Sequence, residues 1–391
     1  MTNRVGTSCR FGAHHEALWS RRENLKPKFD FARKLLSAAF VVLLLTSFGL
    51  GQYVRTDLVA NQPGVALHAD PNLRNGWGLV STASSPYWVS DNDSGFSTLY
   101  QASGQVVSLV VSIPPATGSP ARTLGTPTGI VANISPNATD FVVSENGKSG
   151  KAAFIFATLD GTISGWNFVV GAGPGGNGGN SHATLAADRS GVGASYSGLA
   201  IGSNNGEFLL YAADDGPNRR IDVFDSNFHL VTLSPDAFSD PQIPNTFAPY
   251  GIQNIDGDIW VTYTALNKGQ GGFVDHFGPD GVLKMHGAAH GPLHSPWGLA
   301  KAPPDFGPLS NAILVSNNTA RGRINAFDPN TGEFIGPMLD TNGVPIEVEQ
   351  IWAIQFGRDK PANGNHNQLF FTAGPSEYAN GGFGMIALAP Q

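Results

Sequence analysis

Three histidines are spaced four residues apart in the second half of the chain, at His286, His290 and His294. On a helix this spacing would place the imidazoles on one face, as zinc binding requires. Gly287 and Pro292 instead favour a loop, and no carboxylate close by in the sequence completes a ligand set. We therefore expect an exposed histidine-rich loop without a bound metal, and these three histidines are weak candidates for metal ligands.

Acidic and amide side chains follow several apolar runs, at Asp91, Glu145, Asp214 and Asn317. If the runs are strands that end on one face, these side chains could form a rim that binds hydroxyl groups or a cation such as Ca²⁺. Asp and Asn also cap strand ends by bonding the local backbone. Both interpretations stay open, and no cofactor is expected under the second.

A short phrase containing Gly-Leu or Gly-Ile recurs about every fifty residues. Its copies are Trp77-Gly78-Leu79, Thr128-Gly129-Ile130, Ser197-Gly198-Leu199, Tyr250-Gly251-Ile252, Trp297-Gly298-Leu299 and the degenerate Trp352-Ala353-Ile354. A glycine at this position allows neighbouring units to approach closely around a crowded axis. The repeat therefore predicts a ring of similar units.

Each phrase is followed by short apolar runs joined by turn signals such as Asp280-Gly281 and Thr331-Gly332. Four short strands repeated six times predict an all-β fold, a six-bladed β-propeller. We expect Tyr53 to Ala60 to supply the outer strand of the last blade and close the ring. Phe141 to Asn146 is the expected second strand of the second blade, and the glycine-rich segment 171–193 an inserted surface loop. Five or seven blades stay open, because Ala353 replaces the repeat glycine.

Four of the six phrases carry an aromatic residue before the glycine or alanine: Trp77, Tyr250, Trp297 and Trp352. These rings could surround one mouth of the axial channel, where aromatic faces with a few polar edges suit sugars or flat apolar ligands. Alternatively, they fill the axis and pack the blades together.

Composition agrees with a β-propeller that does not bind nucleic acid. The 391 residues include 49 Gly and 27 Pro, both above average usage, and only 14% are charged. The net charge is −7, and all the Lys and Arg residues of the first fifty lie before residue 35, so the rest of the chain is more acidic still. An acidic body without a basic stripe is a poor partner for nucleic acid. We expect residues 52–391 to form a single domain.

The N-terminus predicts export. Arg33 and Lys34 precede the uncharged run Leu35 to Leu50, which is shorter than the ~20 residues that span a bilayer. Small residues then precede Gln52, so we expect a signal peptide over residues 1–51, with a long positive segment and cleavage after Gly51. An uncleaved anchor is the alternative. After cleavage the chain would have no membrane span, no cysteine, and a secreted, periplasmic or cell-surface location.

The repeats resemble the NHL and gluconolactonase-like (SMP-30-like) propellers, whose blades begin with a Pro-x-Gly-Ile/Leu phrase. More closely, residues 53–389 resemble an uncharacterised family of secreted bacterial propellers, some with PEP-CTERM tails. That resemblance rests on phrases such as Asp70-Pro71-Asn72-Leu73, Ser295-Pro296-Trp297-Gly298-Leu299 and Phe371-Thr372-Ala373-Gly374-Pro375.

The resemblance implies a fold and no known activity. Gluconolactonase-like enzymes hold a divalent metal with side chains just before the repeat glycine, where this chain has Trp, Thr, Ser and Tyr. The metal site of that family is therefore not carried over. We expect a binding module for a small molecule, glycan or protein, with a metal-assisted hydrolase that uses the polar rim as the alternative.

Overall fold

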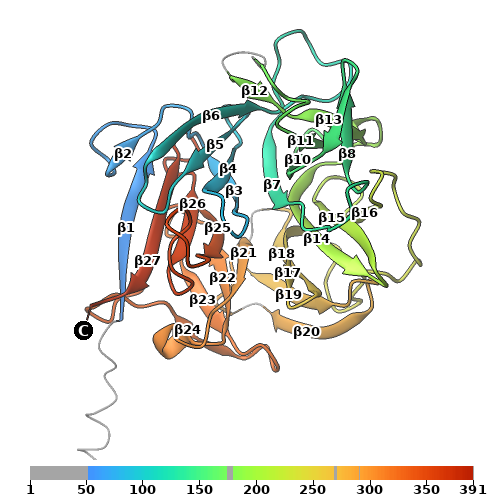
Figure 1. The fold of residues 1–391 in the computed structure, drawn as a ribbon. Helices are drawn as coiled ribbons and strands as arrows, with labels where there is room; N and C mark the ends of the chain where they lie inside the picture. The colour runs from blue at the N-terminus through green and yellow to red at the C-terminus, as the bar shows by residue number, and fades with distance from the viewer. Residues whose placement is uncertain (1–51, 174–178, 268–270, 290, 391) are drawn as a thin grey trace, which may run out of the picture. The chain divides into compact units, whose positions relative to one another are not determined.

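The computed structural model describes residues 52–173, 179–267, 271–289 and 291–390, which form an all-β propeller of six blades (Figure 1). The predicted fold class and blade number are confirmed. Residues 1–51 lie outside the described residues, so the signal peptide and its cleavage site stay predictions.

Each blade is a small antiparallel sheet whose first strand lies nearest the axis. Blade one contains β3 (Gly76–Val80), β4 (Tyr87–Asp91), β5 (Phe96–Tyr100) and β6 (Val106–Ser112). Blade two contains β7 (Pro127–Ala132), β10 (Phe154–Thr158), β11 (Thr162–Trp166) and β13 (Thr184–Asp188). Blade three contains β14 (Tyr196–Asn204), β15 (Glu207–Asp214) and β16 (Arg220–Phe224). Blade four contains β17 (Phe247–Ile255), β18 (Asp258–Ala265), β19 (Gly272–Phe277) and β20 (Leu283–Ala289). Blade five contains β21 (Pro296–Lys301), β22 (Ile313–Asn317), β23 (Ile324–Phe327) and β24 (Phe334–Pro337). Blade six contains β25 (Ile351–Phe356), β26 (Leu369–Ala373), β27 (Gly382–Leu388) and β1 (Tyr53–Ala60).

The N-terminal strand closes the ring, as predicted. β1 pairs antiparallel with β27, from Tyr53 opposite Leu388 to Ala60 opposite Gly382. The buried Tyr53 hydroxyl also donates a hydrogen bond to the Phe306 carbonyl oxygen at 2.6 Å. The last blade is thereby completed by residues from the start of the propeller, and β27 is left without an open edge.

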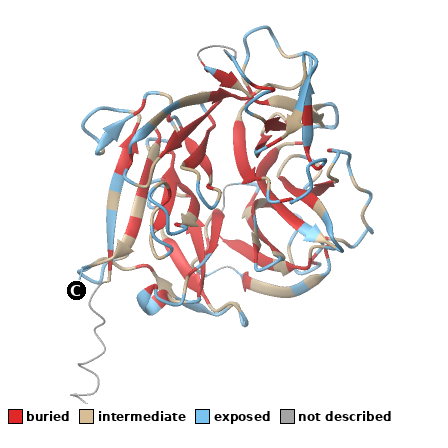
Figure 2. Ribbon diagram, viewed as in Figure 1, coloured by how far each residue is buried: buried red, intermediate tan, exposed pale blue. Residues whose placement is uncertain are grey.

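Neighbouring blades touch at the repeat phrases. A Cβ added to Gly251 would lie 1.8 Å from the carbonyl oxygen of Trp297 in the next blade, so only glycine fits. Hydroxyl groups join the blades at the same level: Ser197 Oγ donates to the Tyr250 carbonyl at 2.8 Å. Thr372 Oγ1 donates to the Trp77 carbonyl at 2.6 Å, which links the sixth blade to the first. The inner strands are consequently buried, while the outer strands are mostly part-exposed (Figure 2).

Blade two differs from the prediction. The segment expected as its second strand forms an inserted hairpin, β8 (Val142–Glu145) with β9 (Lys148–Lys151), and β10 takes the place beside β7. Both segments are apolar runs of similar length. All side chains of β10 are buried, whereas only Val143 of β8 is buried. The sequence pattern of the two runs is similar and does not indicate which of them pairs with β7.

The glycine-rich segment is also shorter than the predicted insertion 171–193. Its second half contains β12 (Ser181–His182), the outer blade strand β13 and the short 3-10 turn η2 (Ser190–Val192). β12 pairs with β6 of blade one, and β13 pairs with β11 of blade two. The remaining short elements are β2 (His68–Ala69), which lies beside β1, and the 3-10 turn η3 (Gly307–Leu309).

Within the described residues, no helix has both the length and the apolar character needed to cross a membrane.

Candidate functional site

The four aromatic residues of the repeat phrase meet at one end of the propeller axis, and we call them the aromatic plug (Trp77, Tyr250, Trp297 and Trp352). The rings of Trp77 and Trp352 stack with their centroids 3.6 Å apart. Trp297 meets both of them edge-on, at 6.4 and 5.9 Å. The three tryptophans are at most 8% exposed, and Tyr250 is part-buried. The plug therefore fills the axis where the inner strands begin.

Hydrogen bonds fix the plug to the blades around it. The indole Nε1 of Trp352 donates to Asn75 Oδ1 at 2.9 Å, and that of Trp297 donates to the Ser197 carbonyl at 3.0 Å. Asn75 in turn donates to Asn92 Oδ1 at 3.3 Å. These contacts orient the rings toward one another.

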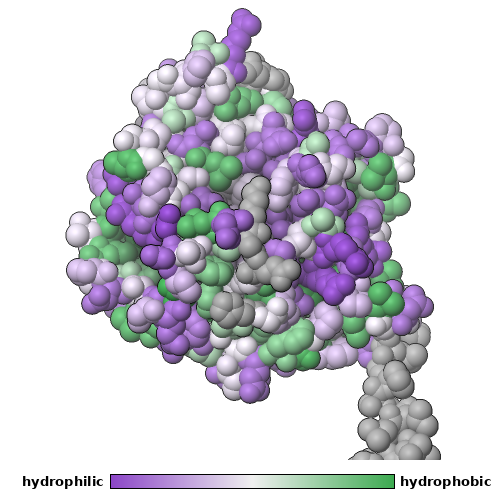
Figure 3. Space-filling model, turned by 180° about the vertical axis from the view of Figure 1, so that it is seen from behind, coloured by the Kyte–Doolittle hydropathy of each residue, from purple (hydrophilic) through white to green (hydrophobic). Residues whose placement is uncertain are grey.

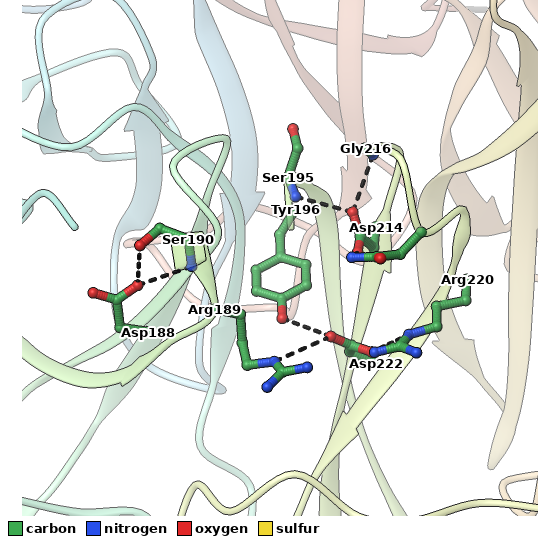
Figure 4. A network of polar contacts seen from close by, with 10 residues as sticks. Asp188, Arg189, Ser190, Ser195, Tyr196, Asp214, Gly216, Arg220 and Asp222 are labelled. Carbon is green, nitrogen blue, oxygen red and sulfur yellow. Dashed lines mark hydrogen bonds and ion pairs between the residues drawn. The ribbon is translucent and has the colours of Figure 1, made fainter. Parts of the chain in front are cut away.

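Three of the four predicted rim residues do end their strands at the same level. Asp91, Asp214 and Asn317 lie opposite Gly76, Tyr196 and Pro296, at the start of the inner strands. Two of them bond neighbouring groups. Asp214 accepts hydrogen bonds from the backbone of Ser195 and Gly216 and from Asn218 (Figure 4). Asn317 donates to the Pro292 carbonyl at 2.6 Å and accepts from the His294 backbone.

Asp91 and Glu145 behave differently from these two residues. Asp91 is fully buried, and among the described residues neither of its carboxylate oxygens has a hydrogen-bond partner. Burial raises its pKa well above the usual range, which favours the neutral form of the carboxyl group. Glu145 lies in the inserted hairpin β8, and its Oε2 is 2.5 Å from His182 Nε2. The structure does not bring Glu145 to the axis.

Asp215, beside the plug, gives a pH-dependent prediction. Burial, with the nearby charge of Asp214, raises the pKa of Asp215 to about 6. Because its pKa is raised in the folded chain, Asp215 contributes most to stability below its unfolded pKa of about 4. This contribution to stability is lost as the pH rises through 6. Asp215→Asn should therefore match wild type near pH 4 and be more stable by about 1–2 kcal/mol at pH 7.5, a value reduced for partial exposure. Urea unfolding at both pH values measures this, and a stability difference independent of pH would contradict it.

An axial channel with a volume of about 480 Å³ runs from the plug toward the other end of the inner strands. Its walls carry Ile130, Ile201, Ile252, Leu299 and Ile354, one from each of five inner strands. This volume lies within the range of sites that enclose small organic ligands. Because the plug closes one end, the channel is a blind pocket whose mouth lies at the opposite face.

The mouth of this channel carries polar side chains that the sequence analysis did not identify. Asn133 and Asn254 donate to the backbone at Ala152 and Ile201, both at 2.9 Å. Gln355 and Arg358 also line the mouth. Within the described part of the chain, Gln355 Oε1 is buried without a hydrogen-bond partner, and no carboxylate lies within ion-pair distance of Arg358.

The predicted histidine-rich loop is only partly correct. His286 lies in strand β20, where it contacts two carboxylates that the sequence analysis did not associate with it. His290 lies outside the described residues. His294 lies in the loop before β21, part-buried and bonded through its backbone to Asn317.

Comparison with known proteins finds relatives that cover most of the chain. No protein-family model matches the chain. The uncharacterized protein L690 of Acanthamoeba polyphaga mimivirus is 30% identical over 341 residues, which cover 84% of each chain. The chain belongs to the family of this protein. The uncharacterized protein R648 of the same virus is 28% identical and covers 90% of this chain and 85% of its own length. Both relatives are viral, so the bacterial origin stays a prediction.

Solved structures agree on the fold alone. A protein of unknown function from Bacteroides thetaiotaomicron matches 86% of this chain and 76% of its own length, with 10% identity and a TM-score of 0.51. Virginiamycin B lyase from Staphylococcus aureus matches 86% of this chain and its own full length, with 11% identity and a TM-score of 0.45. At that level of similarity its activity has no bearing on this family member.

Proposed function

We propose that this protein is a binding module whose ligand is a small organic molecule with an apolar body and an anionic group. The observation that carries the proposal is the blind axial channel, which has aliphatic walls, an aromatic closed end and an arginine at its open end. An apolar pocket with a few convergent polar groups is the arrangement that small-molecule sites share.

The mouth residues support the anionic part of the ligand. In an acidic chain, the Arg358 guanidinium at the mouth has no carboxylate partner among the described residues and offers a forked set of donors. The buried, unpaired Gln355 Oε1 beside it is a costly arrangement that a ligand donor would relieve. Asn133 and Asn254 are engaged by the backbone and hold the mouth in shape.

The face of the molecule seen from behind shows no large apolar contact area (Figure 3). Seen from behind, hydrophilic and hydrophobic side chains are interspersed over the face of the molecule instead of forming one continuous apolar patch (Figure 3). Large exposed apolar patches are typical of protein-binding surfaces. The face in Figure 3 therefore gives no support for a protein partner, and the channel favours a small-molecule ligand.

The test uses 8-anilinonaphthalene-1-sulfonate, an aromatic anion whose fluorescence rises in apolar surroundings. We expect one bound molecule per chain. Arg358→Gln should weaken binding about tenfold, because a charge-assisted hydrogen bond is lost. Ile252→Phe should weaken it at least as much by narrowing the channel, with folding checked by circular dichroism.

The matched control is Arg74→Gln, which removes an exposed arginine before β3, at the plug end of the blades. It should leave the affinity unchanged. Binding that is equally sensitive to Arg74 and Arg358, or insensitive to Ile252→Phe, would mean that the dye binds outside the channel and would refute the proposal.

A further inference from the structure

A second group of side chains with ligand chemistry lies in blade four, in its outer strands β19 and β20. Asp275 of β19 and His286 of β20 are cross-strand partners. Asp240 joins them from the segment that connects blade three to blade four. His286 Nδ1 lies 2.6 Å from Asp240 Oδ2 and 3.1 Å from Asp275 Oδ1. One ligand atom from each residue falls within 4.8 Å of the others.

The two carboxylates of this cluster are buried, and their hydrogen-bond partners do not compensate for the cost of that burial. Asp275 is 0% exposed and Asp240 is 9% exposed. Among the described residues, neither oxygen of Asp275 accepts a hydrogen bond, and the buried hydroxyl of Tyr263 has no partner either. Two buried carboxylates beside one imidazole carry more negative charge than the imidazole can balance, so the cluster either keeps a proton on a carboxyl group or binds a cation.

Blade three provides an internal comparison, because Asp222 of β16 occupies the same position as Asp275. In blade three, Asp222 lies opposite Ala212, which lies opposite Leu199. In blade four, Asp275 lies opposite Val261, which lies opposite Ile252. Leu199 and Ile252 each follow the repeat glycine of their blade. Asp222 is fully compensated. Its oxygens accept from Tyr196 at 2.8 Å and from Arg220 at 2.7 Å (Figure 4).

Asp275 lacks both of these partners, because the same register places Pro249 and Phe273 where blade three has Tyr196 and Arg220. Asp275 instead contacts His286 of the neighbouring strand, which also contacts Asp240. Blade four therefore has two carboxylates and one imidazole where blade three has a salt bridge. This is the composition expected of a metal site.

We propose that Asp240, Asp275 and His286 form a binding site for one divalent transition-metal ion, with zinc as the ion that suits two carboxylates and one imidazole. Asp240 is oriented for this role, because its Oδ1 accepts the Gln242 backbone N–H at 2.7 Å and leaves Oδ2 toward His286. The His286 Nδ1 nitrogen is the ligand, so the ion displaces its proton on binding.

The site goes beyond the proposed binding function, since none of its residues lines the axial channel. Its effect is structural. The ion ties the segment carrying Asp240 to the two outer strands of blade four, a link that joins consecutive blades far from the axis.

The experiment titrates the full chain, freed of metal with a chelator, with Zn²⁺ in a calorimeter. We expect one ion per chain, an enthalpy that changes with the ionisation heat of the buffer because a proton is released, and a melting temperature raised by roughly 5 °C in excess Zn²⁺. Co²⁺ in the same site should give visible absorption of the intensity that four-coordinate cobalt shows.

Two variants and one control decide the assignment. Asp275→Asn and His286→Gln should each abolish stoichiometric binding and the rise in melting temperature, and circular dichroism shows whether they fold. His276→Gln is the control, because His276 also lies in β19 but pairs with Asp258 at 2.7 Å. It should leave the binding and the rise in melting temperature unchanged. Absence of stoichiometric Zn²⁺ in the wild-type protein, or binding that survives in both folded variants, would overturn the proposal.

Discussion

Replacing Trp352 by alanine should lower the free energy of unfolding by about 3–5 kcal/mol, the range for removal of a large buried aromatic side chain. Trp352 is 1% exposed, stacks on Trp77 at 3.6 Å and contacts the rings of Trp297 and Tyr250. These neighbours come from blades one, four and five, so the cavity would open where several blades meet. Rigid strands on all sides cannot collapse into it.

Denaturant unfolding of the variant measures this loss. Trp352→Phe should lose about 1–2 kcal/mol, because a ring is kept while the hydrogen bond to Asn75 is lost. Phe168→Ala is the matched aromatic control, since Phe168 is 73% exposed and its removal should change stability by less than about 0.5 kcal/mol. A Trp352→Ala loss as small as that of Phe168→Ala would show that the plug does not hold the blades together.

Removal of strand β1 should have an effect of at least equal size. A chain that starts at Asn61 lacks residues 52–60 and leaves β27 with an unpaired edge. It also loses the buried side chains of Tyr53, Leu58 and Val59, each worth about 1.5–3 kcal/mol of burial. Their sum approaches the total stability of a typical domain. We expect this chain to aggregate or to melt without a cooperative transition.

The control for this truncation is the chain that starts at Gln52, which keeps β1 whole. It should melt cooperatively by circular dichroism and remain monomeric by light scattering. Equal melting temperatures for the two truncations would mean that the ring is stable without its closing strand.

The architecture was predictable because the repeat is written in local sequence. Each glycine of the phrase marks a close approach between blades, as at Gly251, and this constraint recurs whatever the loops between copies contain. Ring closure by β1 was predictable for a related reason: a strand-like segment before the first phrase had no blade of its own.

The errors came from choices that only three-dimensional position decides. Two apolar runs compete for the second place in blade two, and the run that reaches β7 is the one at Phe154–Thr158. The functional residues were harder still. Gln355 and Arg358 belong to residue types that are common on surfaces, and nothing in their spacing indicates a channel mouth. Asp240 lies 46 residues before His286, so their contact depends on how the whole of blade four and the segment before it fold.

The aromatic residues show which structural features the repeat predicts and which it does not. The sequence identified Trp77, Tyr250, Trp297 and Trp352 as residues that share one level of the axis, and the structure brings all four together. The sequence did not indicate that these residues close one end of the channel and leave the other end open. The repeat phrase predicts their position along the inner strands, but it does not predict the width of the channel.

The central claim is that the blind axial channel binds a small apolar anion, and a crystal structure with 4-bromobenzoate tests it most directly. Anomalous scattering from bromine locates the probe without reference to the protein. We predict one strong bromine peak inside the channel between Ile130, Ile252 and Ile354, with the carboxylate toward Arg358 at the mouth. Bromine found only on the outer surface, or only at the exposed side of the plug beside Tyr250, would contradict the account.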